Sequence, residues 1–269
     1  MKTISTLIFG MLNLVIFSQS PNLVIPRGHT DVVTSSTCSK NGKYLLTGSW
    51  DLSAKLWDIK SSEILSYPSQ SEIQSVDISY DSKFIIIGTK EKEVKLFKIT
   101  GELVKTISDH TGSINSVAFS PNNEKHYFAT ASLDGMVYIY DLSGRKFLTL
   151  SHKNPVNSVC FSSDGNSILT CSDNTAFLYN LSGEIVQTFM VNGHSDKINQ
   201  AKISSDGKSL VTCSNDGTCN IWSSNGIKKY TIVHSDMVTA CDISSDNSII
   251  VSGSINGEII ISNISGVTI

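Results

Sequence analysis

Histidines return along this chain at a nearly constant interval. His29, His110, His152, His194 and His234 are separated by 81, 42, 42 and 40 residues, and 81 is two periods with one histidine skipped. The residues that close the copies keep the same count: Trp57, Phe97, Tyr140, Tyr179, Trp222 and Ser262. A fixed period of about 40 residues predicts six copies of one supersecondary unit.

Each copy has the local pattern of antiparallel strands. In residues 193–222, an alternating run at Ile198, Ala201 and Ile203 is followed by a turn at residues 205–207 and two further apolar runs. Alternation bounded by Asp-Gly turns predicts strands joined as hairpins. The equivalent turns are Lys40-Asn41-Gly42, Tyr80-Asp81-Ser82, Pro121-Asn122-Asn123, Ser163-Asp164-Gly165, Ser205-Asp206-Gly207 and Ser245-Asp246-Asn247. No helix is expected after residue 20.

Two stretches, Gly28-His29 to Trp57-Asp58 and Gly193-His194 to Trp222, resemble the Trp-Asp (WD) repeat of β-propellers. The resemblance covers residues 23–269. It implies an all-β fold, a β-propeller of four-stranded antiparallel blades with six repeats. An incomplete seven-bladed ring is the alternative. The expected domains are a signal peptide at 1–20 and a WD-repeat propeller at 21–269.

Composition excludes few partners but disfavours a polyanion. The chain has 269 residues, 21 basic and 24 acidic, with a formal net charge of −3 and no long charged run. It therefore lacks the basic patch typical of nucleic-acid binding, and no nucleic-acid partner is expected. The unbroken repeat favours one closed body without a linker.

The first twenty residues stand outside the repeat. Lys2 precedes an apolar run at residues 7–17, and small residues follow at Ser18 and Ser20, which is the outline of a secretory signal peptide. The alternative is an apolar segment packed on the propeller. We therefore expect a secreted or cell-envelope protein without a stable membrane span after signal removal, with a cytoplasmic location as the alternative.

The two chain ends compete for one place. Residues 22–25 form a short apolar run, and in the WD family such a strand commonly joins the last blade as its outer strand, which removes an exposed sheet edge. Residues 267–269 could begin the same strand.

A serine, a histidine and an aspartate recur together and suggest either a hydrolase triad or a structural motif. The set returns in repeat after repeat, whereas an enzyme needs one, and no nucleophile elbow accompanies it. The resemblance implies a structural tetrad that ties the strands of a blade together. Its predicted members are His29, Ser49, Asp51, Trp57, His110, Ser132, Asp134, Tyr140, His194, Ser214, Asp216 and Trp222.

Some repeats depart from this set. The second has Ser69 for histidine, Glu91 for aspartate and Phe97 for tryptophan, so we expect it to rely on its apolar strand at residues 84–87 instead. The fourth has Tyr179 and a shortened turn at Cys171-Ser172-Asp173. The sixth has Asn256 for the acid and Ser262 for the aromatic residue.

The six cysteines invite a metal or disulfide interpretation. Cys160 and Cys213 align with small residues of other repeats and are expected in the core. No Cys-x-x-Cys pair is present, so neither a metal nor a cofactor is expected. Cys213 and Cys219 could face each other across a hairpin as a disulfide. The triplets at Asn180 and Asn263 fit the glycosylation pattern but fall at repeat positions.

The mouth of the ring is the candidate partner-binding face. A polar residue follows the first apolar residue of each innermost strand: Thr34, Gln74, Asn115, Asn157, Asn199 and Thr239. In WD propellers this strand lines the channel, so a polar collar is implied. Trp50, Leu133, Asn215 and Ile255 precede the tetrad acid, and an exposed Trp50 would be a hot spot. Alternatively, Trp50 folds onto its own blade.

These features predict a non-catalytic scaffold that binds a protein or peptide. The scaffold role rests on the resemblance and on the lack of a unique site. One alternative is a docking or sensory module of a larger enzyme, such as a secreted caspase-like peptidase. Another is a small-ligand binder or enzyme that uses the polar collar.

Overall fold

The computed structural model describes residues 28–60, 64–121, 126–190 and 193–269. The predicted signal peptide and the predicted strand at 22–25 lie outside these ranges. The chain divides into two units, Met1–Thr30 and Asp31–Ile269. All strands described below belong to the second unit.

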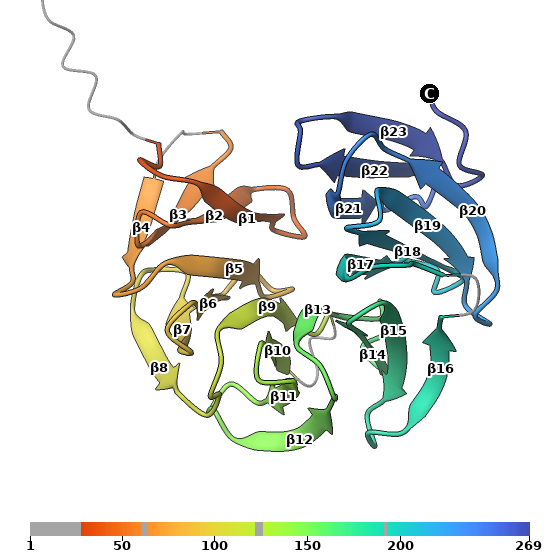
Figure 1. The fold of residues 1–269 in the computed structure, drawn as a ribbon. Helices are drawn as coiled ribbons and strands as arrows, with labels where there is room; N and C mark the ends of the chain where they lie inside the picture. Colours follow the sequence, from red (N-terminus) through yellow and green to blue (C-terminus); the bar gives the residue numbers. More distant parts are fainter. Residues whose placement is uncertain (1–27, 61–63, 122–125, 191–192) are drawn as a thin grey trace, which may run out of the picture. The chain divides into compact units, whose positions relative to one another are not determined.

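The second unit is built from six antiparallel sheets that follow one another in chain order (Figure 1). Blade 1 contains β1(Val33–Cys38), β2(Tyr44–Ser49), β3(Ser53–Asp58) and β4(Ile64–Pro68); blade 2 contains β5(Ile73–Ile78), β6(Phe84–Thr89), β7(Val94–Lys98) and β8(Leu103–Ile107). Blade 3 contains β9(Ile114–Phe119), β10(Phe128–Ser132), β11(Met136–Tyr140) and β12(Lys146–Ser151); blade 4 contains β13(Val156–Phe161), β14(Ser167–Ser172), β15(Thr175–Asn180) and β16(Ile185–Phe189). Blade 5 contains β17(Ile198–Ile203), β18(Ser209–Ser214), β19(Thr218–Ser223) and β20(Lys228–Val233), and blade 6 contains β21(Val238–Ile243), β22(Ile249–Ser254) and β23(Ile259–Asn263).

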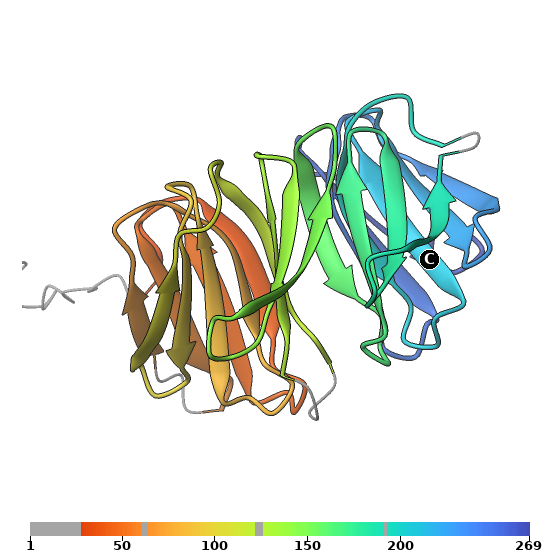
Figure 2. The same ribbon diagram turned by 90° about the horizontal axis from the view of Figure 1, so that it is seen from below.

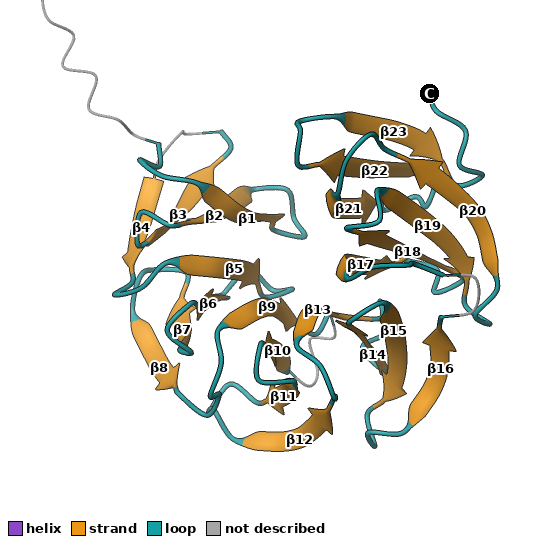
Figure 3. Ribbon diagram, in the orientation of Figure 1, coloured by secondary structure: helices purple, strands orange, loops and turns teal. Residues whose placement is uncertain are grey.

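The architecture confirms the predicted propeller of six repeats. Five sheets have four strands, and each pairs in simple sequence order. Figure 2 shows the same sheets from below. The sixth has three strands, and a single bridge from Ser262 to Thr268 begins a fourth. Residues 267–269 therefore start this outer strand, one of the two alternatives considered from the sequence. The described residues contain strands, turns and loops but no helix (Figure 3).

In the five blades whose first hairpin turn is described, the hairpin closes where the sequence predicts it. The last residue of each described triplet has a positive φ: Gly42, Ser82, Gly165, Gly207 and Asn247. The hydroxyl of a serine just before the turn donates to the turn's Asp or Asn, as in Ser204 Oγ to Asp206 Oδ1 at 2.7 Å. Short polar residues bond their own backbone in this way and stabilise tight hairpins. The predicted turn at residues 121–123 lies mostly outside the described residues.

Neighbouring blades pack through small residues on the second strand. In blade 1, Gly48 faces Ile73 and Val76 of the next innermost strand, and a Cβ there would lie 2.6 and 2.7 Å from their methyl groups. Ala131, Cys171 and Cys213 take the same position in later blades and are fully buried. These interfaces form continuous apolar cores between successive blades.

Candidate functional site: the blade tetrads and the loop face

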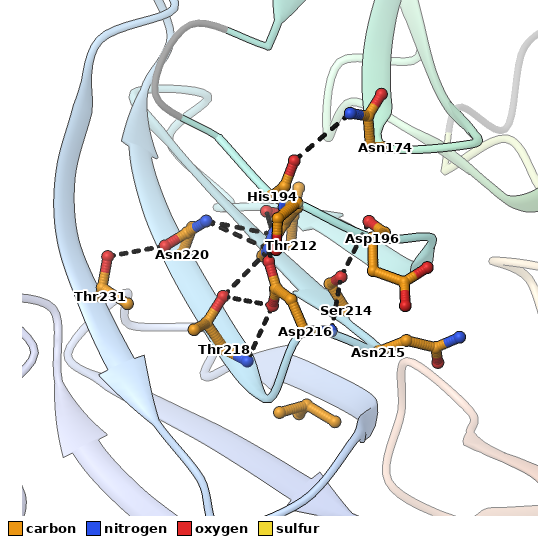
Figure 4. A network of polar contacts seen from close by, with 12 residues as sticks. Asn174, His194, Asp196, Thr212, Ser214, Asn215, Asp216, Thr218, Asn220 and Thr231 are labelled. Carbon is orange, nitrogen blue, oxygen red and sulfur yellow. Dashed lines mark hydrogen bonds and ion pairs between the residues drawn. The ribbon is translucent and has the colours of Figure 1, made fainter.

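The imidazole of His194 ties together the strands of blade 5 (Figure 4). Its Nδ1 lies 3.0 Å from Asp216 Oδ2, and its Nε2 lies 2.7 Å from Thr212 Oγ1. Trp222 Nε1 donates to the same threonine oxygen at 2.8 Å. The backbone N–H of Ser195 donates to Asp216 at 2.9 Å. Both imidazole nitrogens of a buried histidine are thus satisfied within one blade.

The hydroxyl member of this tetrad is Thr212, not Ser214 as predicted. Ser214 Oγ donates to the carbonyl oxygen of Asp196 at 3.0 Å and accepts from the backbone N–H of Asp216. The serine therefore closes the turn at the strand end, whereas the imidazole lies beside the middle of the strand. A hydroxyl recurs at the threonine position as well, at Thr47, Thr130, Thr170, Thr212 and Ser252. That recurrence was the signal that sequence reasoning missed.

Blade 3 repeats the arrangement with one change. His110 Nδ1 lies 2.9 Å from Asp134 Oδ2, and Nε2 lies 2.8 Å from Thr130 Oγ1. Tyr140 takes the place of tryptophan, but its hydroxyl donates to Asp109 at 3.3 Å rather than to the threonine. Ser132 again bonds a backbone carbonyl, that of Gly112. The predicted histidine and aspartate of this blade are paired, and the predicted serine is replaced by threonine.

In blade 1 the tryptophan and the hydroxyl meet. Trp57 Nε1 donates to Thr47 Oγ1 at 2.9 Å, while Ser49 Oγ donates to the carbonyl oxygen of Asp31. Asp51 accepts from the hydroxyl and backbone N–H of Ser53. His29 belongs to the unit Met1–Thr30, so its predicted place in this tetrad stays a prediction.

In blades 4 and 6, the imidazole keeps its hydroxyl partner but has no aspartate. His152 Nε2 lies 3.2 Å from Thr170 Oγ1, and His234 Nε2 lies 2.7 Å from Ser252 Oγ. In blade 6, Glu258 takes the acid's place: it accepts from the backbone N–H of Ser235 at 2.9 Å and lies 3.4 Å from His234 Nδ1. The spacing of the repeats predicted Asn256 at the position of the acid. Glu258 lies two residues later, after the turn, and takes that role instead.

Blade 2 relies on apolar packing, as predicted. Ile85, Ile86 and Ile87 are completely buried. Phe97 packs edge-on against Tyr67 of blade 1 at 5.4 Å between ring centroids. Interdigitated apolar side chains thus take the place of the polar tetrad in this blade.

The electrostatics of the tetrads favour a neutral imidazole beside an ionised carboxylate. Burial lowers the pKa of His194 below its ordinary value, although Asp216 opposes this shift. Burial opposes ionisation of Asp216, but hydrogen bonds from Thr218, Ser195 and the imidazole lower its pKa overall. Burial alone lowers the pKa of His152 to about 4. His194 is buried inside its blade, His152 and Asp216 are half-buried, and the geometry supports a structural role for all three.

The six cysteines are free thiols. Cys213 and Cys219 oppose each other on β18 and β19, but they are not bonded, and Cys213 is buried at the small-residue position as predicted. Within the described part of the chain, no group of three or more His, Cys, Asp or Glu residues is placed to hold a metal ion. The same residues contain no helix with the length and hydropathy needed to cross a membrane.

The predicted polar collar links neighbouring blades. Asn115, Asn157 and Asn199 each donate through Nδ2 to a backbone carbonyl of the next blade, at 2.9, 2.9 and 2.8 Å. The hydroxyl of Thr34 reaches the carbonyl of Ile73 at 2.7 Å. Thr239 bonds only within its own blade, to Gly253. The three asparagines and Thr34 therefore hold neighbouring blades together, whereas Thr239 does not.

The loops between the second and third strands carry the other predicted residues. Trp50, Leu133 and Ile255 are exposed, and Asn215 is half-buried and accepts from Asn199. Because every blade runs in the same sense, these loops lie at the same end of their sheets. We call this end the loop face. Near blades 3 to 5 it carries a pocket of about 280 Å³ lined by Leu133, Asn154, Pro155, Asn157, Asp173 and Lys197.

Comparison with known sequences gives a consistent assignment. A profile described as "WD domain, G-beta repeat" matches residues 20–58, 101–141, 144–180, 183–223 and 226–261, more than half of the chain. The unmatched stretch 59–100 includes the first three strands of blade 2, where the histidine, aspartate and tryptophan are all replaced.

Several curated proteins are similar to the chain. The serine-threonine kinase receptor-associated protein of Dictyostelium discoideum is 29% identical over 150 residues, which are 55% of this chain and 51% of that protein. The mitotic checkpoint protein bub3 of the same organism is 26% identical over 211 residues, 55% of this chain and 62% of that protein. DNA damage-binding protein 2 of Mus musculus is 31% identical over 143 residues, 50% of this chain and 33% of that protein. The matches thus span between a third and two thirds of these relatives.

Proposed function

The chain belongs to the WD-repeat family, and from this premise we propose that it is a non-catalytic scaffold that binds a protein or peptide at its loop face. Fold alone does not decide function, so the proposal rests on the surface that the fold presents.

The observation that carries the proposal is the pocket around Leu133. The leucine is 48% exposed on the loop between β10 and β11, and it shares the pocket with Asn157, Asp173 and Lys197. An apolar side chain beside one acidic and one basic residue suits a peptide, which offers apolar side chains together with charged groups. Trp50 and Ile255 add exposed apolar side chains at the same end of their blades.

The tetrads support a non-catalytic role. In each described tetrad, the serine hydroxyl is bonded to a backbone carbonyl, and the imidazole bonds a threonine or serine within the blade. A hydrolase would need the serine beside the imidazole and open to substrate. No observation favours the alternative of a module in a larger peptidase, and export from the cytoplasm stays a prediction for the N-terminal segment.

The proposal is tested by affinity capture from native extract with quantitative mass spectrometry. Leu133→Asp should reduce capture of a specific partner at least tenfold, because a charge replaces an apolar anchor in the pocket. The matched control is Leu103→Asp on the outer strand β8, where the leucine is 50% exposed and far from the loop face. Undiminished capture of the partner by both variants would place the contact elsewhere. Capture reduced to the same extent in both variants would point to a general surface effect.

A further inference from the structure

One face of blade 6 has the composition of an interior surface but lies open. We call the side of a blade toward the next blade in sequence its forward face. In blade 5, Val211, Cys219 and Ile221 occupy this face and are completely buried. The equivalent residues of blade 6 are Val251, Ile259 and Ile261, with exposed fractions of 40%, 69% and 45%. Exposed apolar patches of this kind mark binding surfaces.

The glycine on this face shows what is missing. A Cβ at Gly88 would meet Ile114 and Val117 of the following blade at 2.5 and 2.9 Å, as one at Gly48 would meet Ile73 and Val76. A Cβ at Gly253 would meet nothing within 4 Å. In blades 1 and 2, the glycine makes room for two β-branched side chains spaced three residues apart. Blade 6 has the same space beside Gly253, but no side chains of a following blade fill it.

The opposite wall belongs to blade 1 and is also uncovered. Val33 begins β1 and is 51% exposed, whereas its equivalents Ile73, Ile114, Val156, Ile198 and Val238 are completely buried. Val33, Val251, Gly253 and Ile259 line one cavity of about 410 Å³. Figure 1 shows β1 and β21 at the two ends of the series of blades, without a blade between them.

The polar links between blades stop at the same place. In blade 5, Asn199 donates through Nδ2 to the carbonyl of Val238 in blade 6. In blade 6, the hydroxyl of Thr239 donates to the carbonyl of Gly253 in the same blade. On the other end of the sheets, Ser163 Oγ donates to the carbonyl of Ser205, and Ser205 Oγ donates to that of Ser245. Apolar and polar contacts therefore both run blade to blade as far as blade 6.

We propose that the cleft between the forward face of blade 6 and the innermost strand of blade 1 binds a β-sheet of a partner protein, which inserts as one further blade. The five existing interfaces continue in the same order to this face, and each packs a forward face on an innermost strand. The partner strand would place a β-branched side chain over Gly253 and a small apolar side chain three residues later. The innermost strand of blade 1 is less suited to cover the forward face of blade 6, because it has the polar Ser36 at a position where the other blades have a buried apolar residue. Those residues are Val76, Val117, Val159, Ala201 and Cys241. This surface is separate from the loop face, and neither proposal depends on the other.

The test supplies a blade as the probe. The full chain is extended after Ile269 by a flexible linker with a protease site and a copy of residues 193–233, which carry the complete tetrad of blade 5. A second probe uses residues 110–151. After cleavage of the linker, at least one copy should co-elute with the chain at one to one. Val251→Asp combined with Ile259→Asp should reduce this retention at least tenfold. Ile185→Asp combined with Val186→Asp, both exposed on β16, is the control.

Three results would overturn the proposal. Separation of both copies from the unmodified chain would mean that the cleft does not take a blade. A disulfide that forms readily in the Val33→Cys, Gly253→Cys variant would mean that blades 6 and 1 close on each other. A dimer in sedimentation that Val251→Asp and Ile259→Asp dissociate would identify a second copy as the occupant. The loop-face proposal would survive all three results.

Discussion

Single hydroxyl groups carry the polar connections inside the blades. Thr212 accepts from Trp222 Nε1 and donates to His194 Nε2, so it connects two strands and the loop that bears the histidine. The aspartate then fixes the other imidazole nitrogen. Removing the shared hydroxyl leaves the buried Trp222 Nε1 without a partner and leaves His194 Nε2 with only the longer contact to Asn220 Nδ2 at 3.3 Å, which is costly because neither nitrogen can reach water.

We predict that Thr212→Val lowers the free energy of unfolding by about 1–3 kcal/mol, because valine keeps the shape but leaves Trp222 Nε1 unpaired and His194 Nε2 with only its longer contact to Asn220. Urea unfolding followed by circular dichroism measures the change. Thr106→Val on the exposed outer strand β8 is the control and should change stability by less than about 0.5 kcal/mol. Equal stability of the two variants would contradict the assignment of Thr212 to the tetrad.

A second prediction concerns pH. Burial lowers the pKa of His152 to about 4 in the folded chain, below its ordinary value of 6.5, so the unfolded chain binds this proton more readily. Stability should therefore be fully present above about pH 6.5 and fall as pH decreases toward 4, with a slope from this group of at most about 1.4 kcal/mol per pH unit. His152→Gln should reduce the slope in urea midpoints measured from pH 7.5 to 4.5. An unchanged slope would contradict the burial of this imidazole.

At the scale of the element, the hairpin turns set where each blade begins its second strand. Gly42, Gly165 and Gly207 adopt positive φ without steric cost, but Ser82 has φ 57°. The hydroxyl of Ser82 is also buried, and it makes no hydrogen bond among the described residues. Blade 2 is thus strained at the one described turn where serine replaces glycine or asparagine.

We predict that Ser82→Gly stabilises the chain by about 1 kcal/mol, because it relieves left-handed strain and removes an unpaired hydroxyl. Thermal unfolding measures the effect. The reverse change, Gly42→Ser, should destabilise blade 1 by a similar amount. Loss of stability with Ser82→Gly would mean that the backbone entropy of glycine outweighs the relief of strain.

At the scale of the whole molecule, the two ends of the blade series differ in what they can accept. Gly48 is enclosed by Ile73 and Val76, whereas the equivalent Gly253 faces open space. We predict that Gly48→Val destabilises the chain by about 1–3 kcal/mol or more through overpacking, while Gly253→Val is nearly neutral. Chemical unfolding of both variants gives the comparison. A comparable loss at both positions would mean that blade 6 is covered in solution.

The sequence by itself determined the repeat, its six copies and the turns, because these depend on periods and on residues that act within a few positions of themselves. The alternation and the Asp-Gly turns repeat in phase, so strand order follows directly. The buried apolar strand of blade 2 was also predictable, since its isoleucines replace the missing polar residues.

Only the tertiary structure decided which side chains meet. Thr212 and Ser214 lie two residues apart on one strand, and only the position of the imidazole selects the threonine. Glu258 replaces the expected Asn256 because its longer side chain reaches the same backbone N–H. The exposure of Val251 and Ile259 likewise depends on a neighbour that packs against them, and a period in the sequence carries no information about whether that neighbour is present.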